Sequence, residues 1–171
     1  METENRRREL LTLLQEGGEP VTGNELAKRF GVSRQVVVQD IAILRAAGEK
    51  VLATPQGYLI PRARFEPVVR AVVACRHSRE QIEEEIGIIV DLGGKVLDVI
   101  VEHPVYGEMR GNLMIASRRD LSIFLEHLSK TEAQPLSALT DGVHLHTIEA
   151  TAQTIIKEIF SQLNQAGFLV R

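Results

Sequence analysis

Glycines and helix-capping residues divide the first sixty residues into three short helical segments. Leucines recur in a charged run that ends at Gly17-Gly18, and Thr22 with Glu25 has the pattern of a capping box. Gly31 can adopt the left-handed conformation that turns a chain sharply, and Ser33 can cap the helix that follows. This spacing predicts two helices joined by a tight turn, with another helix before them.

A short hairpin is expected after the third helix, which should run from Ser33 to about Ala47. Strand-forming residues stand on both sides of Pro55-Gln56-Gly57, a typical turn sequence. Three helices and a hairpin indicate a winged helix-turn-helix over residues 1–62. In that fold the third helix reads the major groove of DNA.

The third predicted helix can be sorted into an inner and an outer face. Val37, Ile41 and Leu44 recur at helical spacing and should pack inward. Arginine can contact guanine or phosphate, glutamine can pair with adenine, and valine can meet a thymine methyl group. Alternatively, the valines pack on the hairpin or on a partner chain and the arginine is a solvated charge. The candidate DNA contacts at the start of this helix are Ser33, Arg34, Gln35, Val36, Val38 and Gln39.

The second part of the chain, residues 63–171, alternates strand-like and helical segments after a polar break near Pro61. Capping boxes at Ser78 and Ser117 predict two helix starts. A short link between two strand segments predicts an antiparallel pair, so we expect an α+β fold with helices on one face of a sheet. The expected strands are 68–76, 95–102, 108–116, 143–150 and a short 168–170, with a last helix over 153–166.

Composition and charge restrict the class of protein. A chain with 44% hydrophobic and 25% charged residues is not expected to be disordered, collagen-like or a membrane bundle. No apolar run approaches the roughly 18 residues of a spanning helix, and the charged start resembles no signal peptide, so we expect a cytoplasmic protein. The net charge of −3 averages a first part at +1 and a second part at −4. The two parts therefore need separate interpretations.

Histidines supply the most specific candidate chemistry, since a single cysteine, Cys75, excludes an internal disulfide and a cysteine-based zinc cluster. His144 and His146 project to one face of a predicted strand, where they can bind one metal ion or form an ordinary surface or hydrogen-bonded pair. His77 stands at a strand-to-helix junction. Glu83 and Glu85 flank the next apolar stripe about equally, so periodicity does not choose between them. We expect Cys75 to be a core side chain and His127 to lie on the surface.

Four segments carry a resemblance to a known family. Over essentially its full length the chain resembles the niacin-responsive transcriptional repressors, which join a winged helix to a domain named for three histidines. The resemblance implies a metal site at His77, Glu85, His144 and His146, and so favours Glu85 over Glu83. It also implies that the second domain is a two-layer α/β sandwich of the HPr type. The segments that carry it are residues 33–41, 53–58, 101–108 and 142–150.

The implied ligands follow from the same resemblance. Three histidines and one carboxylate suit a divalent transition metal such as Zn, Ni or Fe, with open positions if the ion is octahedral. Nicotinic acid is the implied corepressor. The protein is then expected to be a homodimer that binds double-stranded operator DNA and controls genes of NAD biosynthesis or niacin uptake. The resemblance assigns no effector contacts; from its place in the strand after the Tyr106-Gly107 turn, Arg110 is a candidate cation for the effector, with His103 and Tyr106 as candidate pocket walls. These three residues can instead belong to a turn that only fixes strand pairing.

Two alternatives to a ligand-gated repressor remain at this stage. A metal-dependent hydrolase fused to an interaction module would need a general acid or base beside the ion. Once Glu85 is a ligand, the sequence places no further carboxylate for that role. The other alternative is a DNA-binding protein whose metal is purely structural.

Overall fold

The computed structural model of the chain describes residues 3–61 and 67–170, and each of these two ranges belongs to its own compact unit. Each unit has its own cluster of buried apolar side chains. The predicted boundary between residues 62 and 63 lies outside the described residues. Among the described residues, no helix has the length and apolar content needed to cross a lipid bilayer.

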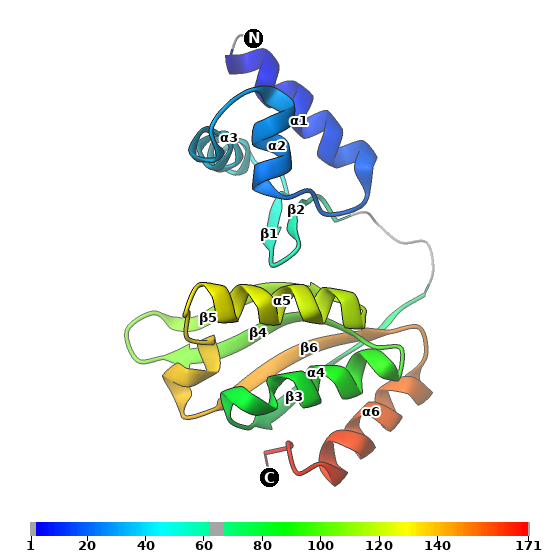
Figure 1. Cartoon of the computed structure of the whole chain (residues 1–171). Helices are drawn as coiled ribbons and strands as arrows, with labels where there is room; N and C mark the ends of the chain where they lie inside the picture. The colour runs from blue at the N-terminus through cyan, green and yellow to red at the C-terminus, as the bar shows by residue number, and fades with distance from the viewer. Residues whose placement is uncertain (1–2, 62–66, 171) are drawn as a thin grey trace. The chain divides into compact units, whose positions relative to one another are not determined.

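The first unit contains three helices and a two-stranded antiparallel hairpin (Figure 1). Thr22 caps the second helix: its Oγ1 accepts from the Glu25 amide at 3.2 Å, and Glu25 Oε2 accepts from the Thr22 amide at 2.9 Å. Gly31 ends that helix with φ +64°, as the tight turn requires. The helix-turn-helix and the hairpin after it are therefore present as expected. The elements are α1 (Thr3–Gly17), α2 (Gly23–Phe30), α3 (Arg34–Ala46), β1 (Leu52–Thr54) and β2 (Gly57–Leu59).

Helix α3 is fixed by apolar packing and by one buried ion pair. Val37, Ile41 and Leu44 are buried, as their spacing predicted. Asp40 on the same helix is also buried, and its Oδ2 accepts from Arg6 Nε of α1 at 2.7 Å. This hydrogen bond to Asp40 raises the pKa of Arg6, so the arginine stays charged. The pair joins the first helix to the third, and the apolar spacing did not predict it.

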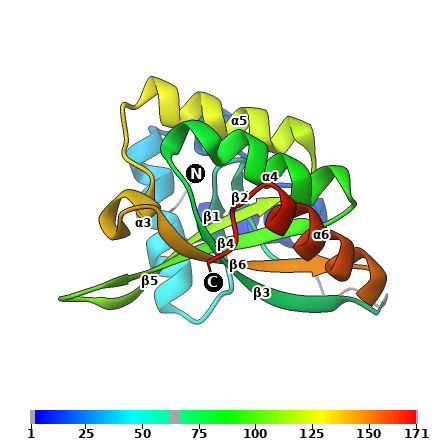
Figure 2. The ribbon, with the colours of Figure 1, turned by 90° about the horizontal axis from the view of Figure 1, so that it is seen from below.

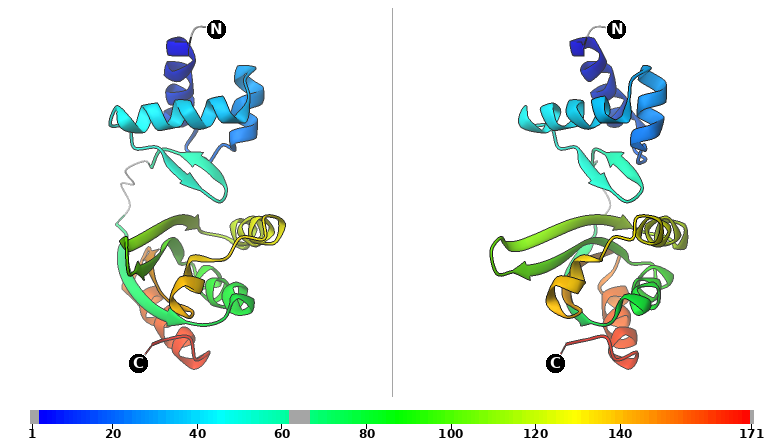
Figure 3. Two further views of the ribbon diagram at one scale, coloured as in Figure 1. Left: turned by 90° about the vertical axis from the view of Figure 1, so that its left-hand side faces the viewer. Right: turned by 60° about the vertical axis from the view of Figure 1, so that its left-hand side comes forward.

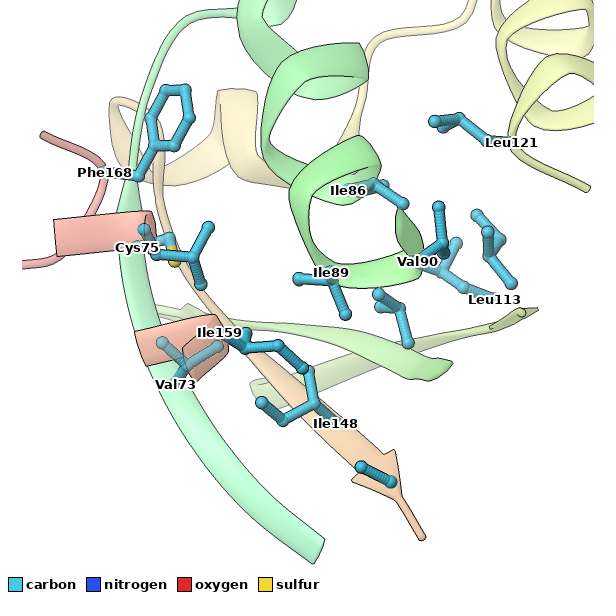
Figure 4. Close-up of a cluster of buried hydrophobic side chains, with 14 of the residues drawn as sticks. Val73, Cys75, Ile86, Ile89, Val90, Leu113, Leu121, Ile148, Ile159 and Phe168 are labelled. Carbon is cyan, nitrogen blue, oxygen red and sulfur yellow. The ribbon is translucent and has the colours of Figure 1, made fainter. Parts of the chain in front are cut away.

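The second unit is a four-stranded sheet with three α-helices on one face (Figures 2 and 3). Strand order is β3-β6-β4-β5, and every neighbouring pair is antiparallel. Figure 4 shows the core between the sheet and the helices, where Ile89 points toward Ile148 and Ile159. The elements are β3 (Val69–Arg76), α4 (Ile82–Asp91), β4 (Lys95–His103), β5 (Gly107–Ile115), α5 (Arg118–Lys130), β6 (Val143–Ala150) and α6 (Gln153–Gln165).

The structure departs from the expected elements at three places in this unit. The turn capped at Ser78 begins as a 3-10 helix, Arg79–Gln81, so α4 starts only at Ile82. The predicted end strand over residues 168–170 is wrong: it forms only an isolated bridge between Cys75 and Leu169. A 3-10 helix, Leu136–Thr140, was not predicted, because five residues are too few to show an apolar period.

Candidate metal centre and adjoining cavity

Three histidines converge on one buried carboxylate in the second unit. His77 lies just after β3, His144 and His146 lie on β6, and Glu85 lies on α4. The distance from Nε2 to the nearer Glu85 oxygen is 2.7 Å for His77 and 3.3 Å for each of the other two histidines. All four residues are buried. The structure thus brings together the four predicted metal ligands.

The fold explains why these residues meet. In the antiparallel register of β3 and β6, His144 pairs with Cys75 and His146 with Val73, and both partners face the core. The imidazoles therefore project toward the helical layer, where α4 presents Glu85. Glu83 is exposed on the other side of the same helix, so packing selects Glu85, which periodicity alone could not do.

Each imidazole is held in one orientation by a backbone carbonyl. Nδ1 lies 2.8 Å from Ser78 O for His77, 2.8 Å from Gly142 O for His144, and 2.6 Å from Asp98 O for His146. A carbonyl oxygen can only accept, so Nδ1 carries hydrogen and donates in all three rings. In the neutral form each Nε2 is left with a lone pair close to the Glu85 carboxylate, and an Nδ1–H held by a carbonyl is typical of metal-binding histidines.

The electrostatics of the cluster favour charged groups despite its burial. Burial alone would lower the pKa of His77 and His146, but hydrogen bonding to Glu85 and its negative charge outweigh it and raise both pKa values. Burial alone would raise the pKa of Glu85, but the histidines hold it well below its usual range. The carboxylate is therefore ionised beside three imidazoles. This donor set fits a divalent ion of borderline softness such as Zn, Ni or Fe.

Cys75 lies next to the cluster but is not a suitable ligand. It is fully buried in the apolar core (Figure 4), as expected from the sequence. Burial and the negative charge of Glu85 raise the pKa of the thiol far above its usual value. A metal ligand must be the thiolate, so Cys75 stays a protonated core side chain.

A cavity of about 220 Å³ adjoins the cluster. An engineered apolar cavity of about 150 Å³ binds benzene, so this one can hold a six-membered ring with a small substituent. The three histidines and Glu85 line one part of it. Among the described residues that line it, none is Lys or Arg. Its apolar walls are Ile82, Ile86, Val99, Leu113, Phe124, Leu128 and Leu136.

The three predicted effector contacts lie elsewhere. Tyr106 is 75% exposed in the β4–β5 turn, and its ring lies 5.0 Å from that of His103. Arg110 donates to Asp98 and Glu108. None of the three lines the cavity, so their role in effector binding stays a prediction. Sequence reasoning missed the aliphatic walls, because ordinary core positions carry the same residue types.

The predicted DNA contacts are found on the accessible side of α3. The side chains of Arg34, Gln35 and Gln39 are exposed, and Val36 and Val38 are half-buried. Ser33 Oγ accepts from the Val36 amide at 3.3 Å and so caps the helix. The predicted base-reading end therefore has the exposure that a major-groove helix requires.

Gly142 positions two of the histidines. Its carbonyl accepts from the His77 amide at 3.4 Å as well as from His144 Nδ1. Its φ is +85°, and a Cβ there would lie 2.3 Å from the His77 carbonyl oxygen. We predict that Gly142→Ala displaces His77 and weakens metal binding about 10–100-fold, the range found when groups that orient metal ligands are lost. Calorimetric titration with Zn²⁺ measures this.

Gly93→Ala is the matched control. Gly93 has a similar φ of +88° with nothing within 4 Å of the added Cβ. Both variants therefore carry the backbone strain, about 1–3 kcal/mol, but only Gly142→Ala creates the clash. Equal metal affinity in the two variants would contradict a positioning role for Gly142.

Comparison with known proteins gives full-length matches. A family model of an HTH domain matches residues 6–59, and one of a 3H domain matches residues 70–171. The transcription repressor NadR of Bacillus subtilis is 44% identical over 169 residues, 98% of this chain and 94% of the relative. The probable transcription repressor NiaR of Thermotoga maritima is 42% identical over 167 residues, with the same coverage.

Proposed function

Because the chain belongs to the family of NadR and NiaR transcription repressors, we propose that nicotinic acid and a divalent metal act together as its corepressor. The HTH domain indicates binding to double-stranded DNA. The relatives are named as transcription repressors and not as enzymes. The hydrolase alternative is therefore set aside. The genes we propose as its targets are those of NAD biosynthesis or niacin uptake.

The observation that carries the metal proposal is the gathering of three imidazoles around one buried carboxylate. Candidate ligand atoms of His77, Glu85 and His144 lie within 4.8 Å of one another. His146 Nε2 is 3.3 Å from the same carboxylate. A divalent cation would replace the protons of the hydrogen bonds between the imidazole Nε2 atoms and the Glu85 carboxylate. The metal would be Zn, Ni or Fe, and four protein ligands leave positions open if it is octahedral.

The cavity favours an open metal over a purely structural one. A closed tetrahedral ion needs no adjoining space, whereas this cavity shares its wall with all four proposed ligands. Burying a carboxylate is costly unless it is paired, and no Lys or Arg stands among the described residues of the lining. We therefore place the nicotinate carboxylate toward the metal and the ring among the apolar side chains. Arg110, bound to Asp98 and Glu108, is not needed as the counter-charge.

Ligand binding can reach the DNA only through a change in the whole repressor. A corepressor must bind the DNA-competent state more tightly than the other state. In helix-turn-helix dimers that state is the one in which two recognition helices match two half-sites.

The likeness of the second unit to the HPr type stays a prediction, supported by its antiparallel sheet with one helical layer.

Filling the cavity tests the effector proposal separately from the metal proposal. A Cβ at Gly111 would lie 3.2 Å from Leu136 and 3.4 Å from Val99, inside the lining. We predict that Gly111→Val lowers nicotinate affinity about 10-fold or more, since even one methylene in an apolar pocket changes affinity by about 10–200-fold. Zn²⁺ affinity should not change. Calorimetric titration of metal-loaded protein with nicotinate measures the first effect.

Asn112→Val is the control, because the neighbouring residue of a strand points to the opposite face. Loss of nicotinate affinity in Gly111→Val alone supports the cavity as the effector site. Equal nicotinate affinity in Gly111→Val and the unaltered protein would show that the effector binds elsewhere.

A further inference from the structure

The sheet of the second unit has an apolar patch on the face opposite its helices. Val73 and Cys75 of β3 and His144 and His146 of β6 face the core, so the residues between them point to the other face. Val72 and Val143 on that face are 56% and 38% exposed, and Val170 beside β3 is 45% exposed. Of the seven large exposed hydrophobic side chains among the described residues, three gather here. The sheet patch is defined as Val72, Ala74, Val143, Leu145 and Val170.

The backbone beside the sheet patch is partly covered already. The Arg76 amide donates to Phe168 O at 2.8 Å, and the Val170 amide donates to Ala74 O at 3.0 Å. The outer edge of β3 is therefore paired at this end. A partner would bind the patch through its side chains, as one sheet packs on another, and not by adding a strand.

We propose that the sheet patch is the surface through which a second copy of this chain binds. A helix-turn-helix repressor reads two half-sites as a dimer, so a second copy is the partner that its DNA-binding unit requires. A twofold interface must be complementary to itself. The patch meets this condition, because its apolar centre is bordered by Arg70 and Glu149, which pair at 2.8 Å across β3 and β6.

The charges select one of two ways of stacking the copies. A twofold axis that runs parallel to the strands, between β3 and β6, places each residue of one copy over the residue of the other copy that is its partner in the β3–β6 register. Ala74 then lies over Leu145 of the partner subunit, and Arg70 lies over Glu149 of the partner subunit. An axis perpendicular to the strands would instead place Arg70 over Arg76 of the partner subunit, two like charges. The first arrangement is the complementary one.

A charge placed in the centre of the patch tests the surface. Val72→Glu should raise the dimer dissociation constant about 10-fold or more, because an unpaired carboxylate is buried once in each copy. Val105→Glu is the control, since Val105 is 76% exposed in the β4–β5 turn. Sedimentation equilibrium of the metal-loaded full chain measures both. A monomeric unaltered protein, or Val72→Glu as dimeric as Val105→Glu, overturns the proposal.

A mixing experiment tests the axis. Arg70→Glu and Glu149→Arg should each weaken the dimer, because like charges then face each other in both halves. In an equal mixture, each altered residue of one variant faces its opposite charge in the other. The mixture should therefore form more dimer than either variant alone. A mixture no more dimeric than the two separate proteins overturns the arrangement, with circular dichroism confirming that both variants are folded.

Discussion

Replacing His144 and His146 together by Ala is expected to abolish metal binding and the response to nicotinate at once. The two imidazoles supply half of the proposed ligand set, and both lie 3.3 Å from the Glu85 carboxylate. Their loss leaves one imidazole and one carboxylate, too few donors to hold a divalent ion in competition with water. Metal content after purification and Zn²⁺ titration measure the first effect. Titration with nicotinate measures the second.

Two single substitutions serve as controls for this variant. His127 is exposed on α5, so His127→Ala should keep both activities. His103→Ala tests the predicted role of His103 as a pocket wall, because His103 does not line the cavity. Retained nicotinate binding in the His144→Ala/His146→Ala variant would reject recognition through the metal. An unchanged metal content would reject the ligand set itself.

Arg34→Ala is expected to weaken operator binding about 10–100-fold, the effect of losing a bidentate contact to guanine of about 1–3 kcal/mol. Arg34 is exposed at the start of α3, beside the capping residue Ser33. If it contacts a base, the loss should be confined to duplexes that carry that base. A duplex selected by the unaltered repressor from a random library supplies the operator for fluorescence anisotropy.

Arg8→Ala distinguishes sequence-specific base contacts from non-specific electrostatic attraction to DNA. Arg8 is exposed on α1, so this variant loses the same charge away from the recognition helix. Loss of a phosphate contact lowers affinity about equally for all sequences and reduces the dependence of affinity on salt. Equal losses in the two variants would assign Arg34 a general electrostatic role.

The elements that depend on local patterns could be predicted from the sequence. β6 has the predicted bounds, Val143–Ala150, because a strand of this length is marked by the residues within it and beside it. The cap at Thr22 was predicted for a similar reason, since a capping box spans only four residues. Such features need no knowledge of distant contacts.

The features that depend on distant packing could not be predicted. The choice of Glu85 over Glu83 requires knowing which side of α4 meets the sheet. The Arg6–Asp40 pair joins residues 34 positions apart, and the cavity is lined in part by the unpredicted 3-10 helix at Leu136. The effector residues were predicted from the segment around the β4–β5 turn, where Tyr106 is exposed and Arg110 already lies in β5.

The most direct test measures operator affinity in four samples: metal-loaded and metal-stripped repressor, each with and without nicotinate. We expect tight binding only when metal and nicotinate are both present, because the cavity proposed for the ring has no Lys or Arg among its described lining residues and depends on the metal for positive charge. Nicotinamide, which lacks the carboxylate, should act more weakly than nicotinate. Operator affinity that nicotinate leaves unchanged in the metal-loaded protein, or raises equally in the metal-stripped protein, would contradict this expectation.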